Sequence, residues 1–162
     1  MEYIFFDRDY YANDGHFDIC GNDFKSLLNV CFQYSTTFSL ILGNSDITHQ
    51  NMLSPYMLYT ESIAAISNFD GKRIYYKACP ETKESLLKIT DHLFNTLYGW
   101  GYNNPENPTF YRSDGSIFFS SIIHEGECRL FPRANEDVSS IISIGNWLDA
   151  STLPKWEDVH DK

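Results

Sequence analysis

The sequence lacks the long apolar runs and the leader pattern that would direct a chain to a membrane or through it. No stretch approaches the ~20 apolar residues that a bilayer-spanning helix needs. The first residues, Met1 to Ile4, show no basic region followed by an apolar run and a small-residue cleavage site, so we expect no signal peptide. We therefore expect a cytoplasmic protein with no membrane partner.

Cationic side chains are also scarce. The chain has 12 Lys and Arg against 22 Asp and Glu, which gives a formal net charge of -10. A nucleic-acid binder needs cations to neutralise phosphates, so the charge argues against nucleic acid as a partner. An acidic molecule attracts a basic protein and raises the rate of encounter, although solubility alone would also explain the charge.

The common motifs of nucleotide-binding and hydrolytic enzymes are missing. The sequence contains no G-x-x-x-x-G-K-[ST], no G-x-G-x-x-G and no G-x-S-x-G. Its cysteines are widely spaced without a C-x-x-C pair, which indicates free thiols in a reducing compartment. These cysteines are Cys20, Cys31, Cys79 and Cys128. We expect no metal, no cofactor and no catalytic residues.

A nucleophilic pair could still be assembled in space from distant residues. Cys20 or Cys79 would have to meet one of three histidines, His16, His49 or His92. No flanking sequence selects any of these pairs, and a buried structural cysteine explains each thiol without chemistry. A small enzyme with an assembled Cys/His/carboxylate site therefore stays an alternative, as does a regulatory subunit.

The overall composition predicts one globular domain covering residues 1–162. A chain of 162 residues is long enough to bury a sizeable core, and 43% hydrophobic with 21% charged residues is ordinary for a globular protein. We find no repeat, linker or low-complexity segment. The unusual feature is an aromatic content of 16%, with 11 Tyr and 3 Trp beside 12 Phe. Most rings should be core, but Tyr and Trp also anchor interfaces.

The apolar spacing predicts two principal helices. The first covers residues 23–34, with Asn22 or Asp23 as its cap, because apolar residues recur there every three or four positions. The second covers residues 81–98, opened by Pro80 and ended by Gly99. A shorter helix is expected from Asn135 through Ile142.

Runs of β-branched and aromatic residues predict the strands. They lie at Tyr3–Phe6, Thr36–Leu42 and Lys72–Cys79, around Phe110, at Ile117–Ile123 and at Cys128–Phe131. Turn signals at Ser113–Gly115 and Glu125–Gly126 make the last three an antiparallel meander. Residues 46–68 are expected to be irregular or briefly helical, and the tail after Trp147 a loop. The predicted fold class is α+β, a mainly antiparallel sheet packed against two principal helices.

Two acidic segments are candidate partner-binding sites. Residues 2–23 contain a single base, Arg8, and interleave acids with rings, which suits steering by charge and anchoring by buried aromatics. A solvated loop or a hairpin tip explains the same residues without a partner. The candidate contact residues are Asp7, Asp9, Tyr10, Tyr11 and Asp14 in the first segment, and Glu125 and Glu127 in the hairpin.

The C-terminal third carries a resemblance to a known class of proteins. The meander residues Asp114–Phe119, the run His124–Pro132 and the helix expected from Asn135, in a small acidic α+β domain, resemble the immunity proteins of bacterial polymorphic toxin and contact-dependent growth inhibition systems. These families share no motif that transfers roles residue by residue. The resemblance implies a cytosolic protein that binds the toxic domain of a cognate effector, often a nuclease, and inhibits it without catalysis.

Overall fold

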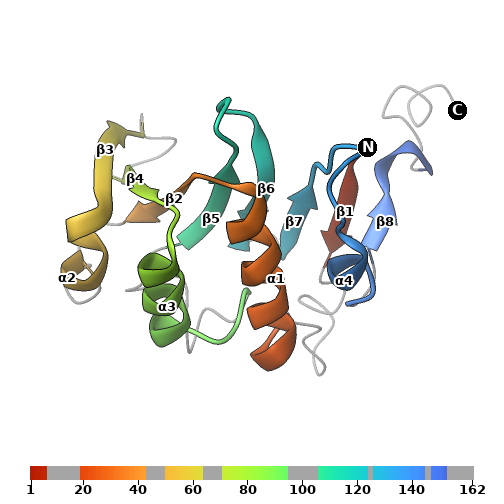
Figure 1. Ribbon diagram of the computed structural model, residues 1–162, viewed down its shortest axis with the longest axis horizontal. Helices are drawn as coiled ribbons and strands as arrows, with labels where there is room; N and C mark the ends of the chain where they lie inside the picture. Colours follow the sequence, from red (N-terminus) through yellow and green to blue (C-terminus); the bar gives the residue numbers. More distant parts are fainter. Residues whose placement is uncertain are drawn as a thin grey trace, which may run out of the picture.

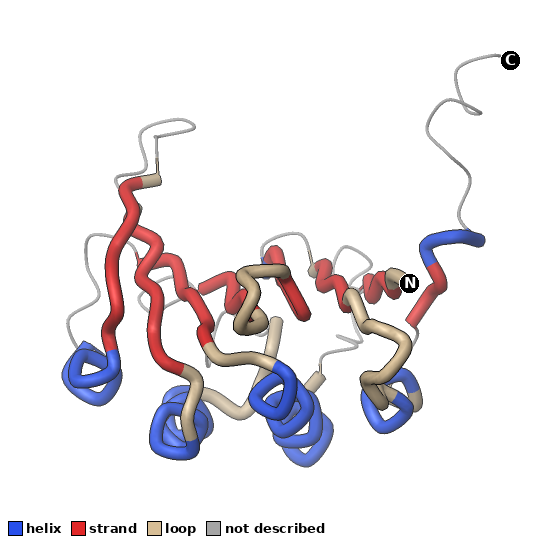
Figure 2. The backbone as a smooth tube through the Cα atoms, turned by 45° about the horizontal axis from the view of Figure 1, so that its top comes forward, coloured by secondary structure: helices blue, strands red, loops and turns tan. Residues whose placement is uncertain are grey.

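One antiparallel sheet organises the protein. The computed structural model describes residues 1–6, 19–42, 50–63, 71–94, 106–123, 126–144 and 147–152. Eight strands pair in the order β3-β4-β2-β5-β6-β7-β1-β8, and every neighbouring pair is antiparallel. The helices α1 to α4 lie on one face of this sheet (Figure 2). The predicted α+β class, with a mainly antiparallel sheet packed against helices, is confirmed.

The elements follow one another along the sequence as Figure 1 shows. The strands are β1 (Tyr3–Phe6), β2 (Thr37–Leu42), β3 (Met57–Ser62), β4 (Lys72–Lys77), β5 (Glu106–Tyr111), β6 (Ile117–Ile122), β7 (Glu127–Leu130) and β8 (Trp147–Asp149). The helices are α1 (Gly21–Tyr34), α2 (Gln50–Leu53), α3 (Pro80–Ile89) and α4 (Ser139–Ile142), with short 3-10 turns at Ser54–Tyr56 and Ala150–Thr152. Within the described ranges, no helix is long and apolar enough to cross a membrane.

The core lies between the sheet and the helices and is built largely from rings. Phe38 of β2 is fully buried, and its ring centroid lies 5.3 Å from that of Tyr76, 5.6 Å from that of Phe110 and 5.8 Å from that of Phe32 on α1. Burying one large apolar side chain contributes about 2 kcal/mol. The strands on either side of β2 are thus joined to α1 through one aromatic cluster.

Helix α1 matches its prediction except at its first turn. It begins at Gly21, and its N-cap is Cys20 rather than Asn22 or Asp23, whose backbone is already helical. An acid in the first turn, here Asp23, still interacts favourably with the helix dipole. The apolar spacing identified the buried face correctly, and the polar residues marked the first turn rather than the cap.

Helix α3 is much shorter than the predicted span of residues 81–98, because it ends at Ile89. Thr90 is extended, with φ -155° and ψ 158°, and its Oγ1 accepts the backbone N–H of His92 at 3.0 Å. The backbone N–H of Leu93 then donates to the carbonyl of Ile19 at 3.0 Å, so the chain pairs with another segment instead of continuing the helix. The apolar stripe correctly predicted that Leu93 and Phe94 are buried, but wrongly predicted that they are helical.

Two strands were not predicted, and both are edges of the sheet. β3 lies in the region expected to be irregular, and β8 in the tail expected to be a loop. All six residues of β3 are exposed, so no alternation of buried and exposed positions marks it in the sequence. An edge strand of this kind is defined by its backbone pairing with one neighbour. The predicted meander of β5, β6 and β7 is confirmed.

A buried arginine joins the two ends of that meander. Arg112 follows β5, is 7% exposed, and donates through Nε and Nη2 to the two carboxylate oxygens of Glu136, each at 2.7 Å. Its Nη1 donates to the carbonyl of Ile117 at 2.7 Å and to Ser116 Oγ at 3.2 Å, and Nη2 also donates to the carbonyl of Phe131 at 2.6 Å. These five contacts match the five N–H donors of a guanidinium.

We call this arrangement the Arg112–Glu136 clamp. It ties the turn between β5 and β6 to the chain that follows β7. The backbone N–H of Arg133 adds a third bond to Glu136, at 2.7 Å, and the Arg112 guanidinium lies 5.2 Å from the centre of the Phe118 ring. α4 begins only at Ser139 and not at Asn135 as predicted, because the backbone N–H of Asp137 donates to the Tyr34 hydroxyl at 2.9 Å and the Asp137 carboxylate accepts the N–H of Ser139 at 3.0 Å.

Replacing Arg112 by Met should destabilise the protein strongly. The change removes the guanidinium donors from two carbonyl groups and from a buried carboxylate, which keeps only the Arg133 backbone N–H; removing one partner of a buried ion pair typically costs about 3–5 kcal/mol. Urea unfolding at neutral pH measures the loss. Arg133→Ala is the matched control, since it removes an exposed pair with Asp114, about half exposed on both sides, that is worth at most ~1 kcal/mol. Equal losses in the two variants would contradict the clamp's structural role.

The clamp also predicts how stability depends on pH. The hydrogen bonds from Arg112 hold the pKa of Glu136 below its ordinary value. A carboxyl group whose pKa is lower in the folded state stabilises above its unfolded pKa of about 4.3, and that stability is lost as the pH falls through the folded value. The free energy of unfolding should therefore fall below about pH 5, and less steeply in Glu136→Gln. Parallel curves for the two proteins would refute this.

Candidate protein-binding surface

Most of the predicted contact residues lie outside the described part of the chain. Asp7, Asp9, Tyr10, Tyr11 and Asp14 of the N-terminal segment belong to residues 7–18, which the structure does not describe. The same holds for Glu125 of the hairpin. Their role in binding stays a prediction.

Glu127, the remaining predicted contact, is used within the protein. It lies on β7, and its side chain is 10% exposed. Its Oε1 accepts a short hydrogen bond from Arg129 Nε, and Arg129 Nη1 also reaches Glu2 Oε1 at 3.3 Å. The bond to Glu127 raises the pKa of Arg129. Arg129 therefore joins β7 to the start of β1, and Glu127, nearly buried and bonded to Arg129, leaves little carboxylate surface for another molecule.

The open face of the sheet, opposite the helices, offers a different surface. Side chains alternate along a strand, so Phe38 and Leu40 of β2 point to the helices while Thr37 and Ser39 point away. Ser39 is paired with Tyr75 on β4 and Thr37 with Tyr111 on β5, and Tyr75 is paired in turn with Tyr59 on β3. The three tyrosines thus share the open face, which no described α-helix covers (Figure 2).

We call Tyr59, Tyr75 and Tyr111 the tyrosine row. The rings of Tyr59 and Tyr75 are stacked, with centroids 4.2 Å apart and planes inclined by 18°. The rings of Tyr75 and Tyr111 are tilted, with centroids 5.6 Å apart. Tyr59 at the edge is 56% exposed, and Ile117, paired with Tyr111 on β6, is 40% exposed. Together they form an apolar band across β3, β4, β5 and β6.

The small residue Ser39 makes the row continuous. β2 lies between β4 and β5, so any large side chain at position 39 would separate the rings of Tyr75 and Tyr111. The serine is fully buried beneath them, and its Oγ lies 3.2 Å from the hydroxyl oxygen of Tyr111. The row is therefore a packed layer with fixed ring positions rather than three independent surface side chains.

Polar contacts hold the middle ring. The Tyr75 hydroxyl donates to Glu61 Oε2 at 3.0 Å. Desolvation, together with this hydrogen bond to a carboxylate, raises the pKa of Tyr75 to about 12, so the phenol stays neutral in any physiological solution. Arg73, on the same face, lies 4.0 Å from Glu61. With Lys77 on the same strand face, the described surroundings of the row contain two cations and one acid.

Strand β3 extends this surface to the edge of the sheet. Among the described strands it pairs with β4 alone, so no described strand lies beside its outer backbone N–H and C=O groups. Three consecutive large apolar side chains, Met57, Leu58 and Tyr59, are 50 to 56% exposed there. Natural edge strands are commonly protected by lysine, proline or inward-pointing charge, and the sequence of β3, MLYTES, has only Glu61. A bulge between Met57 and Tyr59 is its remaining protection.

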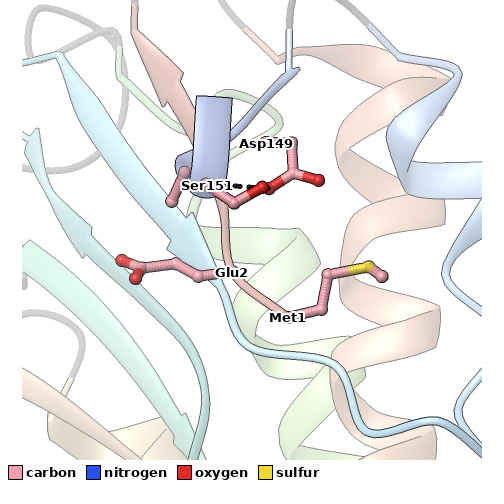
Figure 3. Close-up of a pocket in the computed structure, with 5 residues that line it drawn as sticks. Met1, Glu2, Asp149 and Ser151 are labelled. Carbon is pink, nitrogen blue, oxygen red and sulfur yellow. Dashed lines mark hydrogen bonds between the residues drawn. The ribbon is translucent and has the colours of Figure 1, made fainter. Parts of the chain in front are cut away.

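The surface hollows offer less chemistry than this face. One hollow of about 620 Å³ is lined by Met1, Glu2, Asp149, Ala150 and Ser151 (Figure 3). Both of its acids already have partners. Asp149 Oδ1 accepts the hydroxyl of Ser151 at 2.7 Å and its backbone N–H at 2.9 Å, which lowers the pKa of Asp149, and Glu2 Oε1 lies 3.3 Å from Arg129 Nη1. The Ser151 hydroxyl and the Asp149 carboxylate contact one another only as part of this turn, two residues apart, and the lining contains no histidine, cysteine or lysine.

Two of the nucleophilic pairs considered from the sequence, Cys20 with His92 and Cys79 with His92, lie within the described residues. Cys20 and His92 lie opposite one another in an isolated antiparallel bridge, whereas His16 and His49 lie outside the described residues. The sulfur of Cys79 instead lies 3.5 Å from Thr82 Oγ1 at the start of α3. Within the described residues, no group of three or more His, Cys, Asp or Glu side chains is placed to hold a metal ion.

The tyrosine row could not be predicted from the sequence, because one of its strands was not predicted. Two of its strands, β4 and β5, were predicted, but the third member lies on β3, which was not. The adjacent residues Tyr75 and Tyr76 also give no sign in the sequence that one ring enters the core and the other faces outward.

No protein-family model, curated protein or solved structure matches this chain.

Proposed function

We propose that this chain is a protein-binding inhibitor, an immunity protein that neutralises a cognate toxin domain by tight, non-catalytic binding. The observation that carries the proposal is the tyrosine row together with the exposed edge strand β3. Monomeric proteins rarely leave contiguous apolar surface of this kind uncovered unless it binds something.

The row has the properties of an interface centre. Tyrosine and arginine are enriched among residues that dominate binding energy, and Arg73 lies beside Tyr75 on the same face. Stacking and the bond to Glu61 fix the rings before binding, so little side-chain entropy is lost when a partner covers them. A standard interface buries roughly 800 Å² on each partner. The three rings with Ile117 supply its apolar centre, and Met57 and Leu58 are further exposed apolar side chains on the edge strand.

The partner we propose is a basic toxin domain. The resemblance implies that such a domain is often a nuclease. The support is the net charge of -10, which would accelerate encounter with a cationic protein. The described residues around the row carry no excess of acids. The net charge of the whole molecule would therefore attract the partner, while the tyrosine rings would make the contact. The acidic segment at Asp7, Asp9 and Asp14 is a second proposed contact.

Co-expression with the product of the adjacent upstream gene tests the function itself. We expect this protein to rescue cells from that product and to co-purify with it as a stable complex. Failure of both rescue and co-purification would remove the proposed function.

Binding of the toxin should depend on the tyrosine row. Tyr59→Ala should weaken the complex by at least about 30-fold, since truncating an interface hot spot costs about 2 kcal/mol or more. Tyr75→Phe should retain most of the affinity, because it keeps the ring. Ile122→Ala is the matched control, an exposed apolar residue on β6 outside the row, and should change affinity less than about 3-fold. Calorimetric titration measures each value. Unchanged affinity in Tyr59→Ala and in Tyr75→Ala would exclude this surface from the interface.

A further inference from the structure

The residue before α1 and the segment after α3 meet in a short antiparallel pairing. The backbone N–H of Gly21 donates to the carbonyl of Asp91 at 2.8 Å, and that of Leu93 donates to the carbonyl of Ile19 at 3.0 Å. Cys20 and His92 are the directly opposed residues between these two bonds. In such a non-hydrogen-bonded pair the Cα atoms are only about 4.5 Å apart and the side chains lie on the same side. The thiol and the imidazole are thus neighbours.

Cys20 occupies a position that favours a thiolate. It is exposed, and it is the N-cap of the 14-residue helix α1 without a side-chain capping hydrogen bond. The positive end of a helix dipole stabilises an anion, and cysteines at helix N-termini ionise more readily than free cysteine. Asp23 in the first turn opposes an anion here. A base on the same side of the pairing, His92, would offset this by taking the thiol proton.

The imidazole itself is held by two further contacts. His92 Nδ1 lies 2.5 Å from Asp91 Oδ1, an arrangement in which Nδ1–H donates to the carboxylate and Nε2 is left as the acceptor. The backbone of His92 is fixed by Thr90, whose Oγ1 accepts its N–H at 3.0 Å and donates to its carbonyl at 3.1 Å. A nucleophile beside a base, with the base oriented by a third group, is the general arrangement of an activated side chain.

We propose that Cys20 is a nucleophilic thiol that reacts with disulfides by exchange, with His92 as its base and Asp91 as a positioning residue. The Cys20 thiol gives its proton to His92 Nε2, and the thiolate attacks one sulfur of a disulfide R–S–S–R. A Cys20–S–S–R bond forms, the original S–S bond breaks, and the leaving RS⁻ takes the proton from His92. The reaction is reversible, and its co-reactant is a small disulfide such as oxidised glutathione.

This site is separate from the tyrosine row. The bridge lies in the helical layer, where the chain leaving α3 meets the start of α1 (Figure 1), while the row faces away from the helices. The inference therefore does not depend on the proposed toxin binding, and it is tested on the isolated protein.

The rate of reaction with the neutral disulfide dithiodipyridine at pH 7 is the test, followed at each cysteine by peptide mass spectrometry. Cys20 should react at least about 3-fold faster in the native protein than in the urea-unfolded protein, because a larger thiolate fraction outweighs the lower intrinsic nucleophilicity. An ordinary surface cysteine reacts no faster when folded. A native rate at or below the unfolded rate would overturn the proposal.

Variants separate activation from structure. His92→Ala should slow Cys20 about 5-fold, and added imidazole should restore the rate, which a purely structural loss would not allow. Asp91→Asn should slow it less. Cys79, which also caps a helix but lies against Thr82, is the internal control and should keep its rate throughout. An unchanged Cys20 rate in His92→Ala, or a loss that imidazole does not restore, would contradict the role of His92.

Discussion

The Arg112–Glu136 clamp is the interaction on which the shape of the open face depends. The guanidinium is almost fully buried, and its donors are distributed between a carboxylate, a hydroxyl and two carbonyl groups from three separate stretches of chain. A buried charge is tolerated only when it is paired and its hydrogen bonds are satisfied. Because Tyr111 directly precedes Arg112 and Ile117 accepts one of its bonds, the clamp also fixes one end of the tyrosine row.

The one-sided placement of the helices has a direct functional consequence. The helices cover the aromatic core on one face of the sheet, and on the opposite face, which no described helix covers, the sheet is stabilised by its own side chains. It does so through stacked rings, a buried serine and the Tyr75–Glu61 bond. The result is an apolar but rigid surface, continuous with the edge strand β3. Such a surface can bind a protein tightly without any reactive group, as an inhibitor does.

The sequence carries the information for the core more fully than for the edges. The apolar spacing located the buried face of α1 and the meander of β5, β6 and β7, since burial imposes a period on these elements. It overextended α3, because Leu93 and Phe94 are buried through pairing with Ile19 rather than through a helix. It missed β3 because every residue of that strand is exposed.

The candidate site was the least predictable part, for a related reason. The tyrosine row is a property of register across four strands, and no local pattern records that Tyr59, Tyr75 and Tyr111 meet above Ser39. Similarly, the Cys20–His92 pair was one of several combinations that the sequence allowed, and only the backbone bridge selects it. The acidic residues proposed from the sequence, Asp7, Asp9 and Asp14, lie outside the described residues, and their role in binding remains a prediction.

The measurement that tests the central claim most directly is hydrogen–deuterium exchange of this protein, alone and bound to the proposed toxin partner. If the open face is the binding surface, slowed exchange on binding will concentrate in β3 and β4, because no described strand covers the outer amides of β3 in the free protein. Slowed exchange confined to α1 and α3, with β3 unchanged, would contradict the account and move the interface to the helical side of the sheet.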